Sequence, residues 1–499
     1  MTLPLSAPLD DHRLTRAMAM RSAWWAAWGA LGRYALAGLT TLALIHLLAP
    51  DDFGLIALTI AVQALIGHVI PVGAHDALIQ RPRLEPSDLD TAFWSILATA
   101  GLTVGLVAVL AAPIAGLFDQ PRLAPLLIGM ALAALLRSAG TVPRALLNRR
   151  LDFKTLTLAR LAGMTIGGIV AITLAALGAN AWSLIAQIVC VNLVGLLLVW
   201  RVAAWQPGRA LNRAALRWLW TFAASVSAST ILSYVIHQAD DQLVGYKLGA
   251  EALGFYALAY SFMAWPVRDV LGGVSVVLYP VVSRFQDDLP RVQTVYLESL
   301  QLAAAFAFPT LALIAISAPV LIPWLMGARW APIVLTTQIL ALSGLREATT
   351  MINGAFYRAL GKPHLHFLLQ PTSAACYLVA FVVGLDYGIA GVAFFYLLTG
   401  LLLQPVAWWM LFGILRLRFA CWLRALLPIM IVTAIMAVSA TVTLHVTHYT
   451  LAWSALAALA TTGIVALVVY VAGLIVAAPV GVRRAVSGGW SVVKRSALL

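Results

Sequence analysis

Charged and imidazole side chains inside long apolar stretches are the residues of this chain best suited to binding chemistry. Arg33 and Arg268 are two of them, and His68 takes the place of Arg268 in an earlier stretch. A guanidinium presents a fork of donors that matches two phosphate oxygens. An ionisable group inside a membrane costs at least about 2.5–3.5 kcal/mol, so it usually faces a cavity or a partner. We predict that these three residues bind an anionic substrate.

Acidic residues accompany these cations. His237, Asp240 and Asp241 share one apolar stretch, and Asp269 follows Arg268 directly. We predict that these four residues couple the protein to an ion, H⁺ or Na⁺, or keep an empty cavity neutral. Structural roles stay open beside this one. Asp269 or Asp240 can neutralise Arg268 simply to hold helices together, and His237 with Asp241, four residues apart on one helix face, can serve packing.

Other charged residues and glycines inside the apolar stretches favour structural roles. Arg137, and Arg346 with Glu347, occupy matching places and suggest structural pairs, whereas Arg160 is open to either interpretation. Two pairs of glycines have the small-xxx-small spacing that lets helices approach closely, and we expect helix contacts at both. These pairs are Gly163 with Gly167 and Gly101 with Gly105.

The sequence contains no motif for a covalent reaction. It has no phosphate-binding G-x-x-x-x-G-K-[ST] loop, no H-E-x-x-H and no G-x-S-x-G. The cysteines Cys190, Cys376 and Cys421 are scattered through apolar sequence, which indicates neither disulfides nor a metal site. We therefore predict no catalytic residues, no metal, no cofactor and no enzymatic activity.

Composition indicates which elements must position these residues. The chain has 499 residues, of which 62% are hydrophobic and 10% charged, and its mean hydropathy is +0.94. Soluble domains have about 25% charged residues, so lipid must be the solvent. We predict an all-α polytopic membrane protein, because helices satisfy their own backbone groups in lipid. About fourteen spans are expected: 24–48, 54–79, 90–117, 123–147, 153–177, 180–200, 217–248, 254–283, 293–317, 331–358, 364–385, 388–414, 424–445 and 451–478.

The basic residues give the orientation. The net charge is +13, and 24 of the 32 Lys and Arg residues lie at the two termini and in alternate loops on one side. Three lie on the other side and five inside the spans. Such an excess marks the cytoplasmic side, so both termini are expected in the cytoplasm, and the basic charge gives no reason to expect nucleic-acid binding.

An internal repeat divides the chain. Residues Leu48–Leu58 and Leu248–Leu258 share Leu, acidic, Gly and Ala-Leu positions at a shift of 200 residues, and Arg137 matches Arg346 at a shift of 209. Two pseudo-symmetric six-helix bundles in parallel orientation follow from an even number of spans in each repeat. The expected parts are a cytoplasmic segment 1–21, bundles 22–205 and 206–418, two further helices in 419–480, and a basic cytoplasmic tail 481–499.

Several stretches together resemble the Wzx-type polysaccharide flippases of the MOP exporter superfamily, in their WzxC-like branch. The most specific is Val142-Pro-Arg-Ala-Leu-Leu-Asn-Arg-Arg-Leu-Asp-Phe153, and the resemblance covers about residues 22–430. The other stretches are Leu48–Leu55, Ala77–Arg81, Ala239–Gly245, Leu253–Tyr260 and Pro280–Asp288. Where such proteins often have Leu-Asp-Asn, this chain has Ala239-Asp240-Asp241, which leaves open which carboxylate matters.

The resemblance implies a function. Such proteins move undecaprenyl-pyrophosphate-linked oligosaccharides from the cytoplasmic to the periplasmic leaflet of the bacterial inner membrane by alternating access. The implied partners are this lipid-linked substrate, membrane lipids, H⁺ or Na⁺, and the polysaccharide polymerase machinery. The alternatives are a multidrug or cation exporter or a lipid II flippase of the same superfamily, and, in another class, a membrane glycan polymerase.

Overall fold

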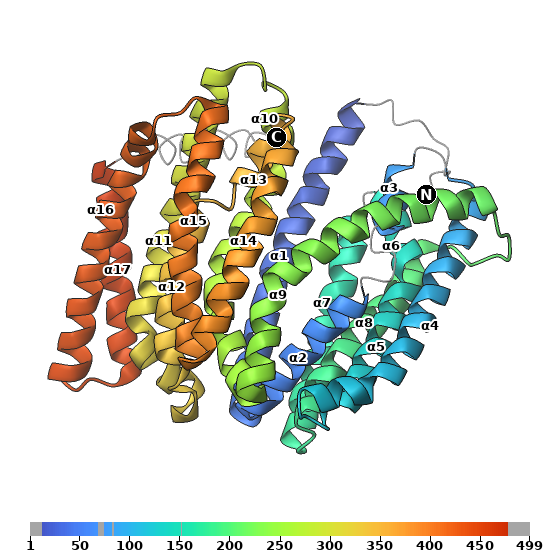
Figure 1. The fold of residues 1–499 in the computed structure, drawn as a ribbon, viewed down its shortest axis with the longest axis horizontal. Helices are drawn as coiled ribbons and strands as arrows, with labels where there is room; N and C mark the ends of the chain where they lie inside the picture. Colours follow the sequence, from blue (N-terminus) through green and yellow to red (C-terminus); the bar gives the residue numbers. More distant parts are fainter. Residues whose placement is uncertain (1–11, 68–73, 82–83, 151, 478–499) are drawn as a thin grey trace. The chain divides into compact units, whose positions relative to one another are not determined.

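The computed structural model describes residues 12–67, 74–81, 84–150 and 152–477, and these form helices joined by turns (Figure 1). No β-strand occurs within those ranges. The predicted all-α fold class is therefore confirmed.

The chain divides into two compact units, Met1–Gly254 and Phe255–Leu499, so the long helix α9 passes from one into the other. The first unit contains α1 (His12–Leu47), α2 (Pro50–Gly67), α3 (Ala74–Gln80), α4 (Pro86–Leu117), α5 (Leu123–Ala139), α6 (Thr141–Arg149), α7 (Phe153–Ala176), α8 (Ala181–Ala203) and most of α9 (Arg213–Ala264). The second contains the end of α9, a π-helical turn (Trp265–Leu271), α10 (Gly272–Ser283), α11 (Leu289–Met326), a short 3₁₀ turn (Ala328–Trp330), α12 (Ile333–Ala348), α13 (Asn353–Ala359), α14 (Pro363–Leu385), α15 (Gly388–Leu415), α16 (Phe419–Leu444), a second π-helical turn (His445–Thr450) and α17 (Ala455–Ala477). The bundle boundary expected near residue 205 rests on the repeat and stays a prediction.

Some helices, such as α7 and α14, follow the expected spans closely, whereas α9 extends across the expected break at 249–253 and the expected span 331–358 is divided between α12 and α13. Within the described ranges, nine helices are long and apolar enough to cross a membrane: Trp28–Leu47, Pro86–Leu117, Leu123–Arg149, Phe153–Ala176, Ala181–Ala203, Leu289–Met326, Gly388–Leu415, Phe419–Thr450 and Ala455–Ala477. A shorter apolar helix covers Gln370–Leu385. The count of fourteen spans stays a prediction.

Aspartates begin two of the long helices. The side chain of Asp152 accepts the backbone N–H of Thr155 at 3.1 Å at the start of α7, and Asp288 accepts that of Arg291 at 3.2 Å at the start of α11. The first turn of a helix leaves backbone N–H groups without helical partners, and a capping carboxylate satisfies one of them. Both helices therefore begin where the charged loops end.

Glycines allow close packing at one of the two predicted places. A Cβ added at Gly163 would lie 2.8 Å from the carbonyl oxygen of Val191, and one at Gly167 would lie 2.9 Å from another carbonyl oxygen of α8. The predicted helix contact is confirmed there, between α7 and α8. A Cβ at Gly101 or Gly105 would meet nothing within 4 Å, so the expected contact on α4 is wrong. Spacing alone does not reveal which face of a helix is covered.

The repeated motif forms a backbone crossing. Gly249 has a φ of 86°, which bends α9 at the position that matches the turn before α2. A Cβ at Gly54 would overlap the carbonyl oxygen of Ala250, and one at Gly254 would overlap that of Pro50. These segments, all in the first unit, pack with no room for side chains. Glycine is required at both crossing points because it has no Cβ.

A carboxylate ties together three helices at one end of the first unit. Asp52, at the start of α2, accepts Arg122 at 3.3 Å and the backbone N–H of Ala181 at 3.1 Å. Arg122 precedes α5 and also donates to Asp51 at 3.1 Å. The end of α1, the start of α5 and the α7–α8 turn therefore lie at the same end of this unit.

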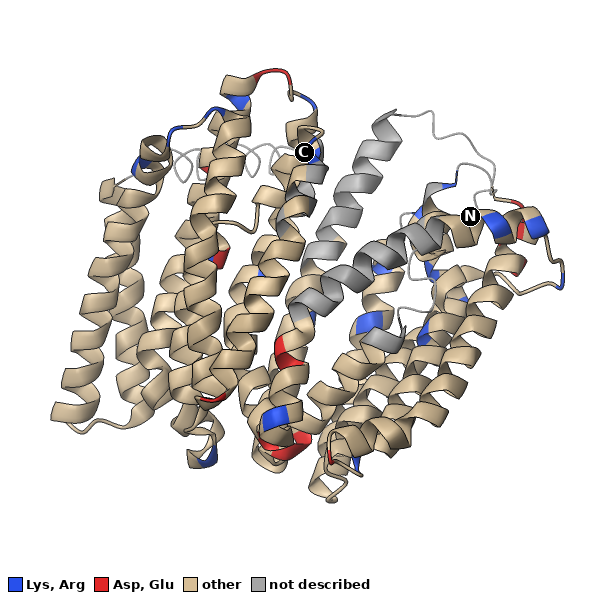
Figure 2. Cartoon of the chain, viewed as in Figure 1, with Lys and Arg blue, Asp and Glu red and all other residues tan. Residues whose placement is uncertain are grey.

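Basic residues in the second unit favour one end, as Figure 2 shows. Arg329 lies at the opposite end, within the 3₁₀ turn after α11. The turns between α10 and α11, α13 and α14, and α15 and α16 hold or adjoin Arg284, Arg291, Arg358, Lys362, Arg416 and Arg418. This arrangement agrees with the alternation expected from the sequence.

Candidate anion-binding cavity

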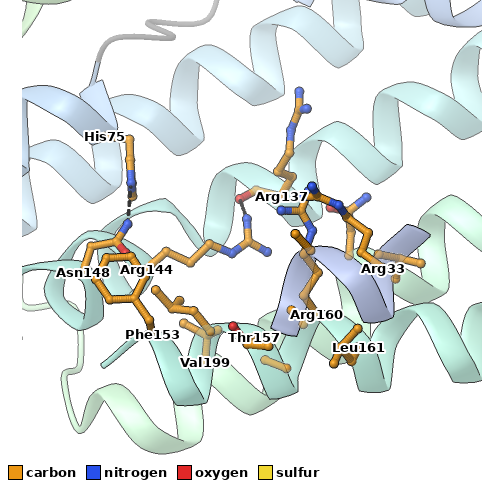
Figure 3. Close-up of a pocket in the computed structure, with 17 residues that line it drawn as sticks. Arg33, His75, Arg137, Arg144, Asn148, Phe153, Thr157, Arg160, Leu161 and Val199 are labelled. Atoms are coloured by element: carbon orange, nitrogen blue, oxygen red, sulfur yellow. Dashed lines mark hydrogen bonds between the residues drawn. The ribbon is translucent and has the colours of Figure 1, made fainter. Parts of the chain in front are cut away.

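The first unit contains a cavity of about 480 Å³ among α1, α5, α6, α7 and α8 (Figure 3). Its polar lining consists of Arg33, His75, Arg137, Arg144, Asn148, Thr157, Arg160 and Asn192. Its apolar lining includes Phe153, Leu156, Leu161, Val191 and Val199. Four arginines in one small space make this the most strongly cationic feature inside the described membrane helices.

Three of these arginines lie at nearly the same depth although they come from three helices. Arg33 lies fourteen residues before the end of α1 and Arg137 fourteen residues after the start of α5, so each is about 21 Å from the end tied by Asp52. Arg160 lies sixteen residues before the end of α7, or about 24 Å from it. Side chains at one depth on neighbouring helices can contact a single ligand.

The fourth arginine reaches the cavity from the short helix α6. Arg144 donates through Nη1 to the backbone carbonyl of Arg137 at 3.3 Å. Gly140 lies between α5 and α6, and a Cβ there would come within 3.1 Å of the Arg144 guanidinium carbon. The glycine therefore leaves room for the guanidinium, and the carbonyl holds it in place (Figure 3).

The four positive charges have no carboxylate nearby in the part of the chain that the structure describes. No described Asp or Glu lines the cavity, and none forms an ion pair with Arg33, Arg137, Arg144 or Arg160. Arg137 and Arg160 are exposed, and the other two are half-buried. At about 2.5–3.5 kcal/mol each, four such groups in a membrane cost about 10–14 kcal/mol. A cost close to the whole stability of a typical domain calls for water or an anion among them.

Neutral hydrogen-bonding groups lie beside the arginines. Asn148 Nδ2 lies 2.9 Å from Nε2 of His75, and the amide of Asn192 donates to the carbonyl of Ile188 at 2.8 Å. Figure 3 shows Arg33 and Arg160 close together on one side, with Arg144 between them and the His75–Asn148 pair, and Arg137 is a further residue of the lining. The cavity thus offers cations at one end and amide and imidazole groups at the other.

The second unit neutralises much of its intramembrane charge. Arg268, in the π-helical turn, donates through Nε to Glu347 at 3.1 Å, and Tyr396 donates its hydroxyl to the same carboxylate at 3.2 Å. Pro266 lies in that turn and has no N–H to continue a regular helix. Arg346 makes a hydrogen bond of 3.4 Å to Gln404. Two arginines and one carboxylate therefore share this site.

Comparison with known proteins decides the family. Residues 43–335, more than half of the chain, match the family described as polysaccharide biosynthesis protein. The chain belongs to this family. The resemblance to WzxC-type transporters is confirmed, and this family member is a multi-pass membrane protein.

Three relatives carry out related biosynthesis. The succinoglycan biosynthesis transport protein ExoT of Rhizobium meliloti (strain 1021) is 28% identical over 65% of this chain and 65% of its own length, slightly under two thirds. The teichuronic acid biosynthesis protein TuaB of Bacillus subtilis (strain 168) is 24% identical over 77% of this chain and 80% of its own. The lipopolysaccharide biosynthesis protein WzxC of Escherichia coli (strain K12) is 23% identical over 72% of this chain and 74% of its own.

Two solved structures share the fold of this family member. The lipid II flippase MurJ in an inward closed conformation has a TM-score of 0.68 and 15% identity, covering 90% of this chain and 98% of its own. An inward-facing multidrug resistance MATE family transporter of the MOP superfamily has a TM-score of 0.63 and 14% identity, covering 78% and 98%. At these identities the likeness concerns the fold alone.

The predicted site residues of this polysaccharide biosynthesis protein have different surroundings. Arg33 lines the cationic cavity of the first unit. Arg268 is paired with Glu347, a partner that the sequence did not indicate. Asp240 is buried and Asp241 half-buried in α9. His68 lies outside the described residues, as do the side chains of His237 and Asp269. A cavity shared by Arg33 and Arg268 stays a prediction.

Sequence reasoning missed most of the cationic cavity. Arg144 lies near the end of the expected span 123–147, where it counts among the basic residues of the cytoplasmic side. The structural pair expected for Arg137 has no acidic partner among the described residues. The seven-residue spacing of these two arginines, which returns to the same helix face after two turns, is the signal that would have found them. The expected association of Arg346 with Glu347 is found, and Arg268 joins it as the direct ion-pair partner of Glu347.

Proposed function

We propose that this chain flips undecaprenyl-pyrophosphate-linked oligosaccharide repeat units, of an exopolysaccharide, a capsule or an O-antigen, from the cytoplasmic to the periplasmic leaflet. The cationic cavity of the first unit is the observation that carries this proposal, because a family that builds polysaccharides has few other uses for arginines deep in the membrane. The excess of basic residues on one side supports a bacterial inner membrane location with both termini in the cytoplasm.

Each part of such a substrate needs a different surrounding. The polyprenyl tail stays in lipid, the diphosphate meets guanidinium groups, and the glycan needs hydrogen-bonding groups and water. Arg33 in the first unit and Arg268 in the second are the proposed contacts of the headgroup, together with His68. Arg268 engages Glu347 through Nε, which fixes its side chain and leaves its two terminal amino groups for an anion.

Transport of this substrate involves no covalent step, and the energy comes from the membrane. One charge moving through 100 mV gains about 2.3 kcal/mol, so a dianion leaving a negative cytoplasm gains about 4–5 kcal/mol. Coupling to H⁺ or Na⁺ adds to this. The proposed coupling residues are His237, Asp240, Asp241 and Asp269. Alternating access then exposes the headgroup site to each side of the membrane in turn, and the polysaccharide polymerase machinery receives the product.

The alternatives fit the charges less well. A multidrug exporter for cations, the second candidate, has the fold of the MATE neighbour, but four arginines without a described carboxylate repel a cation. A lipid II flippase has the same headgroup chemistry and differs in its glycan, so product analysis separates the two. A glycan polymerase needs a reactive site outside the membrane, and the described connections between helices are short.

Deleting the gene and measuring lipid-linked oligosaccharides by mass spectrometry tests the proposal. We expect complete repeat units to accumulate on the inner leaflet while the surface polysaccharide disappears. A gene copy with Arg33→Gln should restore much less polysaccharide than the wild-type copy at equal protein level in the membrane. Unchanged lipid-linked pools together with unchanged surface polysaccharide would contradict the flippase proposal.

A further inference from the structure

We propose that Arg137, Arg144 and Arg160 form, with Arg33, the binding site for the diphosphate group of the lipid-linked substrate. This inference rests on the proposed function and assigns the headgroup to one cavity of the first unit. The three added arginines come from α5, α6 and α7. None of them is expected to be there for packing, because each lines the cavity and has no carboxylate partner within the described residues.

The charge of the cavity selects the class of ligand. Four guanidinium groups demand more than one negative charge, and a diphosphate diester supplies two. Arg33, Arg137 and Arg160 line the cavity from three helices at depths of about 21–24 Å. A diphosphate has two tetrahedral groups, so it can receive bidentate contacts from different directions. A ligand with a single charge would leave most of the guanidinium groups without a counter-charge.

The size of the cavity limits the ligand to its head. A volume of about 480 Å³ lies within the range of about 300–1,000 Å³ that small-molecule sites occupy. A fifty-five-carbon chain and an oligosaccharide together are much larger than that. The cavity therefore takes the diphosphate and the first sugar, and the tail and the rest of the glycan lie outside it.

The arrangement of side chains within the cavity predicts the orientation of the substrate headgroup. Arg144 is held by the backbone carbonyl of Arg137 at 3.3 Å, and Gly140 leaves the space that its guanidinium fills. The Asn148–His75 pair lies next along the cavity, beyond Arg144 (Figure 3). Amide and imidazole groups suit sugar hydroxyls, which both donate and accept. The diphosphate therefore lies among the arginines, and the first sugar lies beside Asn148.

The test measures binding to the purified full-length protein in detergent micelles by titration calorimetry. Farnesyl diphosphate is the probe for a lipid diphosphate, inorganic pyrophosphate for the free anion, and farnesol for the tail alone. We expect farnesyl diphosphate to bind and farnesol to bind at least tenfold more weakly. Arg137→Gln and Arg160→Gln should each raise the Kd for farnesyl diphosphate by about 10- to 100-fold, the loss of one charge-assisted contact.

Two further variants keep the test decisive. Arg201→Gln, an exposed arginine at the end of α8 in the same unit, is the matched control and should change the Kd less than twofold. Arg137→Lys preserves the charge and folding but removes the fork, and we expect it to fall between the wild type and Arg137→Gln. Equal Kd values for the wild type and all cavity variants would overturn the inference, as would binding of pyrophosphate without farnesyl diphosphate.

The outcomes also separate this inference from the proposed function. If deletion of the gene stops polysaccharide export but the cavity variants bind and export as the wild type does, the flippase stands and this cavity is not its diphosphate site. If the cavity variants lose binding of farnesyl diphosphate but deletion leaves lipid-linked pools unchanged, the site stands and the flippase proposal fails.

Discussion

Removing the carboxylate between the two arginines of the second unit should destabilise the protein more than removing either arginine. Glu347 accepts Arg268 at 3.1 Å and the hydroxyl of Tyr396 at 3.2 Å, and its side chain is 14% exposed. Glu347→Gln leaves Arg268 and Arg346 without their counter-charge. Breaking a buried ion pair costs about 3–5 kcal/mol. Because the Arg268 side chain is 27% exposed and keeps some water, we expect a loss of about 2–3 kcal/mol.

Removing the arginine instead of the carboxylate should lower the free energy of unfolding by a smaller amount. Arg268→Gln leaves Glu347 with the Tyr396 hydroxyl and the nearby charge of Arg346, so we expect a loss of about 1–2 kcal/mol. The double variant should lie close to the less stable single variant, since the second change removes a partner that is already alone. Such a cycle gives a coupling energy of about 1–2 kcal/mol.

The free energy of unfolding of the wild type, the two single variants and the double variant is measured by reversible unfolding in mixed micelles with increasing SDS. Arg329→Gln in the same unit, at the opposite end from most of its basic residues, serves as the control, because an exposed charge contributes little. The reasoning would be refuted if the stability losses of the two single variants sum to that of the double variant within about 0.3 kcal/mol. It would also be refuted if Arg268→Gln is less stable than Glu347→Gln. Either result would mean that the ion pair does not hold α12 to the π-helical turn.

Two further predictions concern the first unit. Gly254→Val should sharply lower the amount of folded protein in the membrane, because the valine side chain would overlap the carbonyl of Pro50. Gly101→Val is the control and should express as the wild type does, since residue 101 has open space around it. Equal yields of the two variants in size-exclusion profiles would contradict this prediction. Asp52→Asn should lower the thermal midpoint in detergent by weakening its bonds to Arg122 and the α8 backbone, a loss of about 1.5–3 kcal/mol. Asp51→Asn, at the exposed side of the same pair, should cost less than about 1 kcal/mol, and the reverse order would show that Asp52 does not tie the helices.

Helix class and helix bounds could be predicted from the sequence because they depend on local composition. The apolar run 153–177 is α7, and the run 388–414 is α15, each to within a residue of its predicted bounds at both ends. Lipid leaves the chain little choice there, since each backbone group must find its partner inside the helix. Charge sidedness is equally local, because it depends on which loop holds each Lys or Arg.

The contacts between helices could not be predicted, because they join positions that are distant in sequence. Arg268 and Glu347 are 79 residues apart, whereas Asp240 and Asp269, the partners considered from the sequence, lie nearer to Arg268 along the chain. Arg144 lines the cavity because α6 begins directly after Gly140, whereas the sequence analysis counts this arginine among the basic residues of the cytoplasmic side. In the same way Gly101 has the spacing of Gly163, and the neighbour that would use it is absent.

The two repeats differ most where their sequences correspond. Arg137 matches Arg346 at a shift of 209 residues, so Ser138 stands where the second repeat has Glu347. The second unit therefore has its carboxylate, and the first has a neutral hydroxyl that donates to its own helix at 2.9 Å. The first unit therefore has an uncompensated arginine at the position where the second unit has an arginine beside a carboxylate, which supports the proposal that the first unit binds an anion.

Restoring the missing carboxylate tests that argument. Ser138→Glu places a negative charge next to Arg137, and two like unit charges about 7 Å apart repel by about 2 kcal/mol at an effective dielectric constant near 20. We expect it to raise the Kd for farnesyl diphosphate about 30-fold. Ser138→Gln, equal in size and uncharged, should change it much less, because only the charge opposes the anion. Equal affinities of these two variants would show that the absence of a carboxylate beside Arg137 does not govern anion binding, and the asymmetry of the repeats would then need another cause.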